Sequence, residues 1–141
     1  MITGRYLMII HIPHFRLPDG RVATDAAWAK DLALHFGYIS DVRLCAPLEE
    51  AGVLREGWRV VPELSEPGRL WPLRKRGGWR QVAINLASDF GRIRRAVRQA
   101  DIVHSGLAGW PFPLAWYVLL LRPVYRFQWL NVMESSFWLA G

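Results

Sequence analysis

The 141-residue sequence has a single cysteine, Cys45. One thiol cannot form an internal disulfide or supply a cysteine-based zinc site, so a disulfide-stabilised secreted scaffold and a zinc finger are excluded. Acidic residues are also few, 12 against 18 lysines and arginines, which gives a net charge of +6. This excess favours an anionic partner without specifying which one. Apolar residues make up 52% of the chain, enough for one packed domain.

Several motifs that bind nucleotides or build hydrolase sites are missing. The sequence contains no G-x-G-x-x-G, no G-x-x-x-x-G-K-[ST] and no G-x-S-x-G. Their absence argues against a dinucleotide-dependent dehydrogenase, a P-loop nucleotidase and an α/β-hydrolase. There is also no H-E-x-x-H and no close cluster of His, Asp and Glu, so we expect no metal site and no bound cofactor.

Residues 1–13 are not expected to be a secretory signal. The apolar part of residues 1–13 is short, contains His11 and is followed by no small-residue cleavage site. The longest uncharged run, 102–121, is long enough to span a membrane, but it holds His104 and two prolines and is more typical of a strand, a loop and an apolar helix. We therefore expect a cytoplasmic protein, peripheral at the inner face of the membrane if its basic residues bind lipid.

All of the positive excess lies between Arg69 and Arg98. This window has nine basic residues and one acid, Asp89, whereas the rest of the chain has nine basic and eleven acidic residues. Such a window is typical of a solvated helix face or of a surface that binds phosphate. We do not expect nucleic-acid binding, because no readout motif accompanies the arginines. The candidate residues for an anionic membrane surface are Arg74, Lys75, Arg76, Arg92 and Arg95.

Hydrophobic patterns predict alternating strands and helices. The predicted strands are 5–12, 39–46, 58–62, 101–105 and 126–133. The predicted helices run from Thr24 or Asp25 to Phe36, from Trp79 to Gln99, and from Trp110 or Pro111 to Leu121. Residues 14–21 and 63–78 are predicted loops. This order predicts an α/β fold, a Rossmann-like parallel sheet of about five strands with flanking helices.

Two of the predicted helices have a recognisable buried face. In the first helix, four residues at helical spacing point one way, and Gly37 is placed to end the helix. These residues are Ala29, Leu32, Ala33 and Phe36. In the second helix the apolar positions are Val82, Leu86, Phe90, Ile93 and Val97.

In parallel α/β sheets, ligands bind at the carboxyl ends of the strands. That rule selects residues 14–20, 47–50, 104–109 and 134–137. His104, at a predicted strand end, suits hydrogen bonding to a sugar hydroxyl or acid–base work, and equally suits a half-buried structural role. Glu134 with Ser135 suits polyol recognition or a polar turn. His14 is a further ligand candidate, whereas His11 is expected to be structural and His35 has no assigned role.

Four segments together resemble the N-terminal domain of GT-B-fold glycosyltransferases, particularly the retaining enzymes called family 4. They are RYLMIIHIP at 5–13, DLALHFGYISDVRLCAP at 31–47, ADIVHS at 100–105 and NVMESSFW at 131–138. The third segment is the most specific, because many of these enzymes carry Asp-[Ile/Val]-[Ile/Val]-His before a loop and an apolar helix. The resemblance covers nearly the whole chain in order.

The resemblance implies two Rossmann-like domains that face a cleft. The N-terminal domain binds the acceptor and the C-terminal domain binds the nucleotide sugar. By position, the acceptor side of this chain is lined by Asp19, Gly20, His104, Gly106, Glu134 and Ser135. The basic helix then suits the membrane-docking face of members that act on lipid acceptors. Two features differ from the family pattern: the first loop lacks a glycine pair, and Gly106 stands where many members have a second histidine.

We therefore expect the acceptor-binding part of a hexosyltransferase-type enzyme that moves a sugar from a nucleotide-sugar donor to a sugar or lipid-linked acceptor. Residues 1–141 are expected to be one incomplete domain of a longer protein. The donor-binding domain lies outside it, so no complete catalytic set is expected here and the fragment alone is expected to be inactive. The alternative is a non-catalytic, flavodoxin-like module whose basic face docks on a membrane or a partner.

Overall fold

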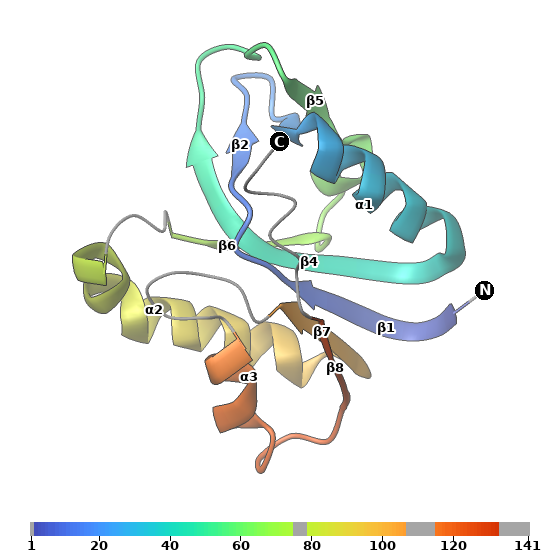
Figure 1. Cartoon of the computed structure of the whole chain (residues 1–141), viewed down its shortest axis with the longest axis vertical. Helices are drawn as coiled ribbons and strands as arrows, with labels where there is room; N and C mark the ends of the chain where they lie inside the picture. Colours follow the sequence, from blue (N-terminus) through green and yellow to red (C-terminus); the bar gives the residue numbers. More distant parts are fainter. Residues whose placement is uncertain (1, 75–78, 107–114, 133–141) are drawn as a thin grey trace.

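The computed structural model describes residues 2–74, 79–106 and 115–132. Within these ranges the chain forms an α/β fold in which helices flank a mixed sheet (Figure 1). The strands are β1 (Ile2–Ile9), β2 (His14–Arg16), β3 (Val22–Asp25), β4 (Ile39–Glu50), β5 (Trp58–Val60), β6 (Leu70–Leu73), β7 (Ile102–Gly106) and β8 (Gln128–Val132). The helices are α1 (Ala26–Tyr38), α2 (Trp79–Arg98) and α3 (Ala115–Leu121), with a 3₁₀ turn at Pro62–Ser65.

The sheet is not wholly parallel, so that part of the sequence prediction is wrong. The strand order is β5-β3-β2-β4-β1-β7-β8, with β6 also paired to β4. β3 runs antiparallel to both β2 and β5, while the remaining pairs are parallel. The reason is the tight turn between β2 and β3, because a short connection can join only antiparallel neighbours. Gly20 sits in this turn with a φ of +87°, which favours glycine.

β1 and β2 pair with successive parts of β4. Ile9 pairs with Cys45, and the next pair is His14 with Leu48. The chain from Ile9 to His14 is therefore two residues longer than the part of β4 from Cys45 to Leu48. The predicted strand 5–12 consequently ends at Ile9, and the predicted loop at 14–21 contains β2.

Two strand segments contain a proline, and the sequence prediction missed both. β4 continues beyond the predicted end through Pro47 to Glu50. Pro47 pairs with Leu73 of β6, immediately before β4 changes partner to β2. β6 lies inside the predicted loop 63–78 and contains Pro72. Pro72 is tolerated because, among the described strands, β6 pairs with β4 alone and is an edge strand.

α1 begins where the sequence predicts. The side chain of Asp25 accepts hydrogen bonds from the backbone N–H of Ala27 at 2.9 Å and of Trp28 at 3.4 Å, which caps the helix. The helix ends at Tyr38, beyond the predicted Phe36, so Gly37 is a helical residue and does not end the helix. The chain passes directly into β4 instead.

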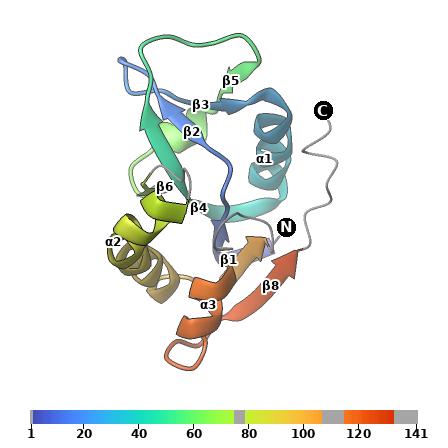
Figure 2. The same ribbon diagram turned by 60° about the vertical axis from the view of Figure 1, so that its left-hand side comes forward.

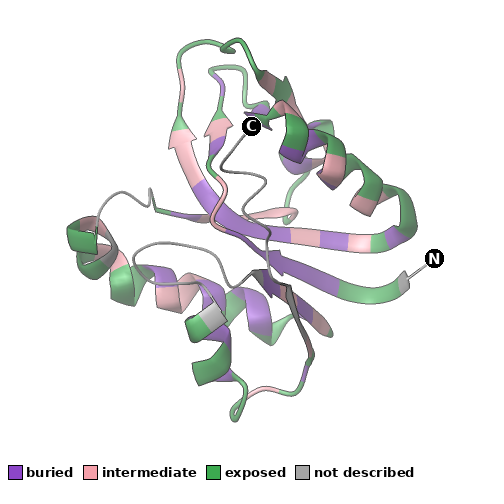
Figure 3. Ribbon diagram, viewed as in Figure 1, coloured by how far each residue is buried: buried purple, intermediate pink, exposed green. Residues whose placement is uncertain are grey.

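The buried faces of α1 and α2 differ from the prediction at one position each. In α1, Ala33 is exposed, and Trp28 lies with Ala29 and Leu32 on the buried face. In α2, Ile93 and Val97 are buried as predicted, but Leu86 is 45% exposed. Figure 3 shows the reason: the first turns of α2 extend past the sheet and only its later turns pack on it.

The sheet separates two hydrophobic cores. Alternate residues of β1 point to opposite faces: Leu7 and Ile9 pack with α2 and α3, whereas Tyr6 and Met8 pack with α1. Figure 2 shows α1 on one side of the sheet and α2 with α3 on the other. Cys45 lies within the first core, and burial raises the pKa of its thiol, which excludes it as a nucleophile. Among the described helices, none is long and apolar enough to cross a membrane.

Candidate functional site

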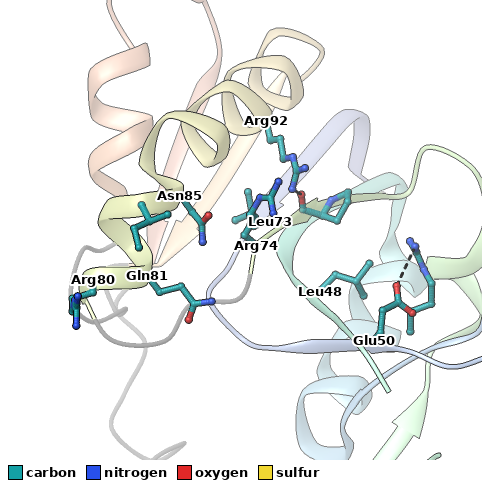
Figure 4. A pocket seen from close by; sticks show the side chains of 11 residues that line it. Leu48, Glu50, Leu73, Arg74, Arg80, Gln81, Asn85 and Arg92 are labelled. Carbon is teal, nitrogen blue, oxygen red and sulfur yellow. Dashed lines mark hydrogen bonds and ion pairs between the residues drawn. The ribbon is translucent and has the colours of Figure 1, made fainter. Parts of the chain in front are cut away.

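A cleft of about 830 Å³ opens where β4 and β6 end and α2 begins. Its walls come from three parts of the chain. β2 and β4 contribute Arg16, Leu48 and Glu50, the end of β6 contributes Pro72, Leu73 and Arg74, and α2 contributes Arg80, Gln81, Ile84, Asn85 and Arg92. Figure 4 shows the α2 and β6 residues on one side of the cleft, with Leu48 and Glu50 on the other. The cleft therefore lies at the carboxyl ends of parallel strands, where ligands bind in such sheets.

The charge of the cleft is positive, because four arginines line it against one carboxylate, Glu50. Arg16 Nη1 lies 3.8 Å from Glu50 Oε1, and both side chains are well exposed, at 46% and 77% (dashed line in Figure 4). An exposed ion pair of this length is weak. Glu50 therefore leaves most of the positive potential of the cleft uncompensated.

Two arginines on one wall are held by the fold. Arg92 Nη1 donates a hydrogen bond of 3.0 Å to the carbonyl oxygen of Pro72, which uses one of the five N–H donors of the guanidinium. The backbone N–H of Arg74 donates to Oδ1 of the buried Asp89 at 3.1 Å. In one bond α2 donates to β6, and in the other the residue after β6 donates to α2, so both bonds hold the end of β6 against the helix. The arginine pair Arg74 and Arg92 is thus positioned by backbone contacts.

His14 has a structural role in this fold. It is fully buried, its Nδ1 lies 2.8 Å from the carbonyl oxygen of Ile12, and its Nε2 lies 3.2 Å from Nε1 of Trp28. A carbonyl only accepts and an indole N–H only donates, so His14 is the neutral Nδ1–H tautomer with both nitrogens in use. Burial lowers its pKa to about 4. We therefore do not include His14 among the ligand-binding residues.

His104 lies in the middle of β7 and not at its end, since the strand continues to Gly106. Its Nδ1 is 2.7 Å from the hydroxyl of Tyr6, and its ring is 6.2 Å from the ring of His35. Burial, with a smaller contribution from His35, lowers the pKa of His104. Because His104 shares the face of the sheet that α1 covers, it lies apart from the cleft beside α2.

The remaining residues selected from the sequence are dispersed. Asp19 is exposed and accepts from the backbone N–H of Arg21 at 3.0 Å, a bond that lowers the pKa of its carboxyl group. Gly20 lines a smaller cleft of about 230 Å³, which shares Arg16 with the larger one. Gly106 ends β7, and Arg95 is exposed on α2 outside the cleft. Lys75, Arg76, Glu134 and Ser135 lie outside the described residues.

Sequence reasoning missed two of the four cleft arginines. Arg16 was assigned to a loop, because β2 is only three residues long. Arg80 belongs to the basic window but was not singled out. Its place in the first turn of a helix that follows a strand was the available signal, since such a turn lies at the carboxyl edge of the sheet. Within residues 2–74, 79–106 and 115–132, no group of His, Cys, Asp and Glu is arranged to hold a metal.

Comparison of the chain with protein-family profiles, curated proteins and solved structures gave no significant match. Function is therefore inferred from the residues and from the geometry of the cleft.

Proposed function

We propose that this chain is the acceptor-binding part of a glycosyltransferase with a Rossmann-like N-terminal domain. The observation that carries the proposal is the position of the cleft, where parallel strands β4 and β6 end and α2 begins. Its volume of about 830 Å³ suits a ligand of one or two sugar rings. The resemblance of residues 100–105 to the Asp-x-x-His segment of these enzymes supports the glycosyltransferase class but not this location, because His104 lies on the face of the sheet that α1 covers.

The cleft offers the polar groups that an acceptor needs. Gln81 and Asn85 are one helical turn apart on α2, and both line the cleft. Their amides donate and accept hydrogen bonds, which matches the two-way hydrogen bonding of sugar hydroxyls. Leu48 and Ile84 supply apolar surface for the sugar ring. In this proposal the chain binds and orients the acceptor, and a second domain holds the nucleotide sugar and stabilises the departing diphosphate.

The double substitution Gln81→Ala/Asn85→Ala is expected to raise the KM for the acceptor on the order of tenfold in the complete enzyme, because two hydrogen bonds of about 1 kcal/mol each are lost. The KM for the nucleotide sugar is expected to stay unchanged. Initial-rate kinetics with a radiolabelled nucleotide sugar measure both constants. Ser88→Ala, an exposed polar residue of the same helix outside the cleft, is the matched control.

This test requires the whole reading frame. Downstream of the codon for Gly141 we expect a second βα domain of about 150 to 200 residues. A reading frame that ends without such a domain contradicts the glycosyltransferase proposal. An equal rise in the acceptor KM of the Ser88→Ala variant contradicts the assignment of the acceptor to this cleft.

A second candidate function is docking on an anionic membrane, and a different surface supports it. On α3, Trp116, Leu119 and Leu120 share one face and are 53%, 48% and 61% exposed. α2 packs against this helix, and Nε of Arg94 on α2 donates to the hydroxyl of Tyr125, just after α3, at 2.9 Å. Arg95 and Arg98 on α2 are exposed as well. Apolar side chains beside arginines are typical of surfaces that bind anionic lipid.

For this second candidate, Leu120→Ala is expected to lower the partition coefficient onto phosphatidylglycerol vesicles, measured by co-sedimentation, about tenfold or more, because one buried leucine contributes about 1.5 to 3 kcal/mol to insertion. Leu54→Ala is the matched control, since Leu54 is 46% exposed in the loop before β5. Equal binding of phosphatidylglycerol and phosphatidylcholine vesicles, or equal loss in both variants, contradicts docking through α3.

A further inference from the structure

The arginines of the cleft point to the chemical class of its ligand. We infer that the cleft binds the phosphate or diphosphate group of a small molecule, through Arg16, Arg74, Arg80 and Arg92. The anion site itself stands on the geometry of the cleft. Only the identification of its ligand as the acceptor rests on the proposed function.

The four arginines approach the cleft from different parts of the fold. Arg16 belongs to β2, Arg74 follows β6, and Arg80 and Arg92 belong to α2. A solvated helix face does not explain this arrangement, because only two of the four lie on one helix. Guanidinium groups form paired hydrogen bonds to phosphate oxygens, so several of them around one cavity suit a multiply charged oxyanion.

The neighbouring groups favour the same ligand. α2 is 20 residues long and begins beside the cleft, so the positive end of its dipole adds to the attraction of an anion. The acids nearby are few: Glu50 lines the cleft, and the buried Asp89 accepts from the backbone of Arg74. The two carboxylates offset two of the four guanidinium charges, and the remaining positive charge suits a ligand with a charge of about two.

Other anionic partners fit less well. The lining residues that the structure describes include no aromatic side chain, so the cleft provides no stacking platform for nucleic-acid bases. The arginines also line different walls of a cleft and do not form the single exposed face that binds a bilayer surface. The amides of Gln81 and Asn85 beside the arginines fit a sugar attached to the phosphate.

The test is isothermal titration calorimetry of the 141-residue chain with inorganic pyrophosphate and with a hexose 1-phosphate, at about 50 mM salt. We expect both to bind, and we expect Arg74→Gln/Arg92→Gln to weaken binding about tenfold or more. The control Arg95→Gln/Arg98→Gln removes the same charge from exposed positions of α2 outside the cleft and is expected to change affinity less than about threefold. Absence of binding to wild type, or equal weakening in the control, overturns the inference.

Because Arg92 also donates to the carbonyl of Pro72, its substitution changes the packing of β6 as well as the charge of the cleft. A second variant that keeps this hydrogen bond separates the two effects. Arg16→Gln/Arg80→Gln changes two exposed side chains of the cleft and is expected to weaken pyrophosphate binding with an unchanged thermal melt. Unchanged affinity in this variant removes Arg16 and Arg80 from the site and overturns the four-arginine assignment.

Binding to vesicles distinguishes a phosphate carried by a lipid from a phosphate carried by a soluble molecule. A preference for vesicles that contain an isoprenoid diphosphate over phosphatidylglycerol vesicles of equal charge, lost in Arg74→Gln/Arg92→Gln, identifies a lipid-linked ligand. Equal binding of both vesicles, together with tight binding of hexose 1-phosphate, identifies a soluble one. Failure of the anion site and failure of the glycosyltransferase proposal give different results. If the gene encodes no donor domain but the protein binds pyrophosphate, the anion site is upheld and the glycosyltransferase proposal is rejected.

Discussion

Acidification from pH 6.5 to pH 4 is expected to lower the free energy of unfolding more in the wild-type chain than in the variant His14→Gln. The cause is the buried imidazole, whose Nε2 accepts from the indole N–H of Trp28. Protonation of Nε2 would place its N–H donor opposite the indole N–H donor of Trp28 inside the core, with no acceptor between them. The folded state therefore holds His14 neutral, and burial lowers its pKa from 6.5 to about 4.

The direction of the effect follows from proton linkage. Below pH 6.5 the unfolded chain binds a proton on His14, whereas the folded chain does not until about pH 4. The unfolded state then binds more protons, so stability falls as the pH falls through this window. A shift from 6.5 to about 4 corresponds to a loss of about 3 kcal/mol by pH 4. That amount is a large share of the stability of a small domain.

Urea unfolding at a series of pH values, followed by tryptophan fluorescence or circular dichroism, measures the difference. The glutamine variant is a suitable control because its amide can donate to the carbonyl of Ile12 and accept from Trp28, but does not titrate. His104, whose pKa is also lowered, contributes with the same sign in both proteins and cancels. Parallel stability curves for the two proteins between pH 6.5 and pH 4 would show that His14 does not titrate as its burial implies.

The elements that the sequence predicts correctly are those whose signal is long. α1 and α2 carry apolar residues at helical spacing over several turns, and the second half of β1 is a continuous apolar run. The missed strands β2, β3 and β6 are three or four residues long. In strands that short, pairing with β4 or with each other decides the conformation, and local propensity does not. The antiparallel position of β3 follows from one turn and leaves no periodic pattern in the sequence.

The sequence predicts individual residues of the candidate site, but not that they meet in one cleft. The rule on carboxyl ends selects the segment that contains Glu50, and the basic window contains Arg74 and Arg92. Their meeting in one cleft depends on β6, which pairs with residues 44–47 of β4 and so ends beside the last residues of that strand before α2 begins. His14 and His104 show the converse. Their positions in the sequence suggest ligands, but both ring nitrogens of His14 and the Nδ1 of His104 take part in hydrogen bonds within the fold.

The substitution Leu7→Ala is expected to lower the free energy of unfolding by about 3 kcal/mol, within the range of about 2 to 5 kcal/mol for buried leucines. Leu7 is 1% exposed in β1, which pairs with β4 on one side and β7 on the other. It packs in the core that also contains Val97 and Tyr117, so its removal leaves a cavity between the sheet and two helices.

The matched control for Leu7→Ala is Leu119→Ala, which removes the same atoms from a side chain that is 48% exposed on α3. Its expected effect is within about 0.5 kcal/mol, because alanine favours helix and little buried surface is lost. Urea titrations with an unchanged slope give both values. A loss of similar size in the two variants would contradict the packing of β1 between the two cores, because the cost of a leucine deletion depends on how completely its neighbours enclose it.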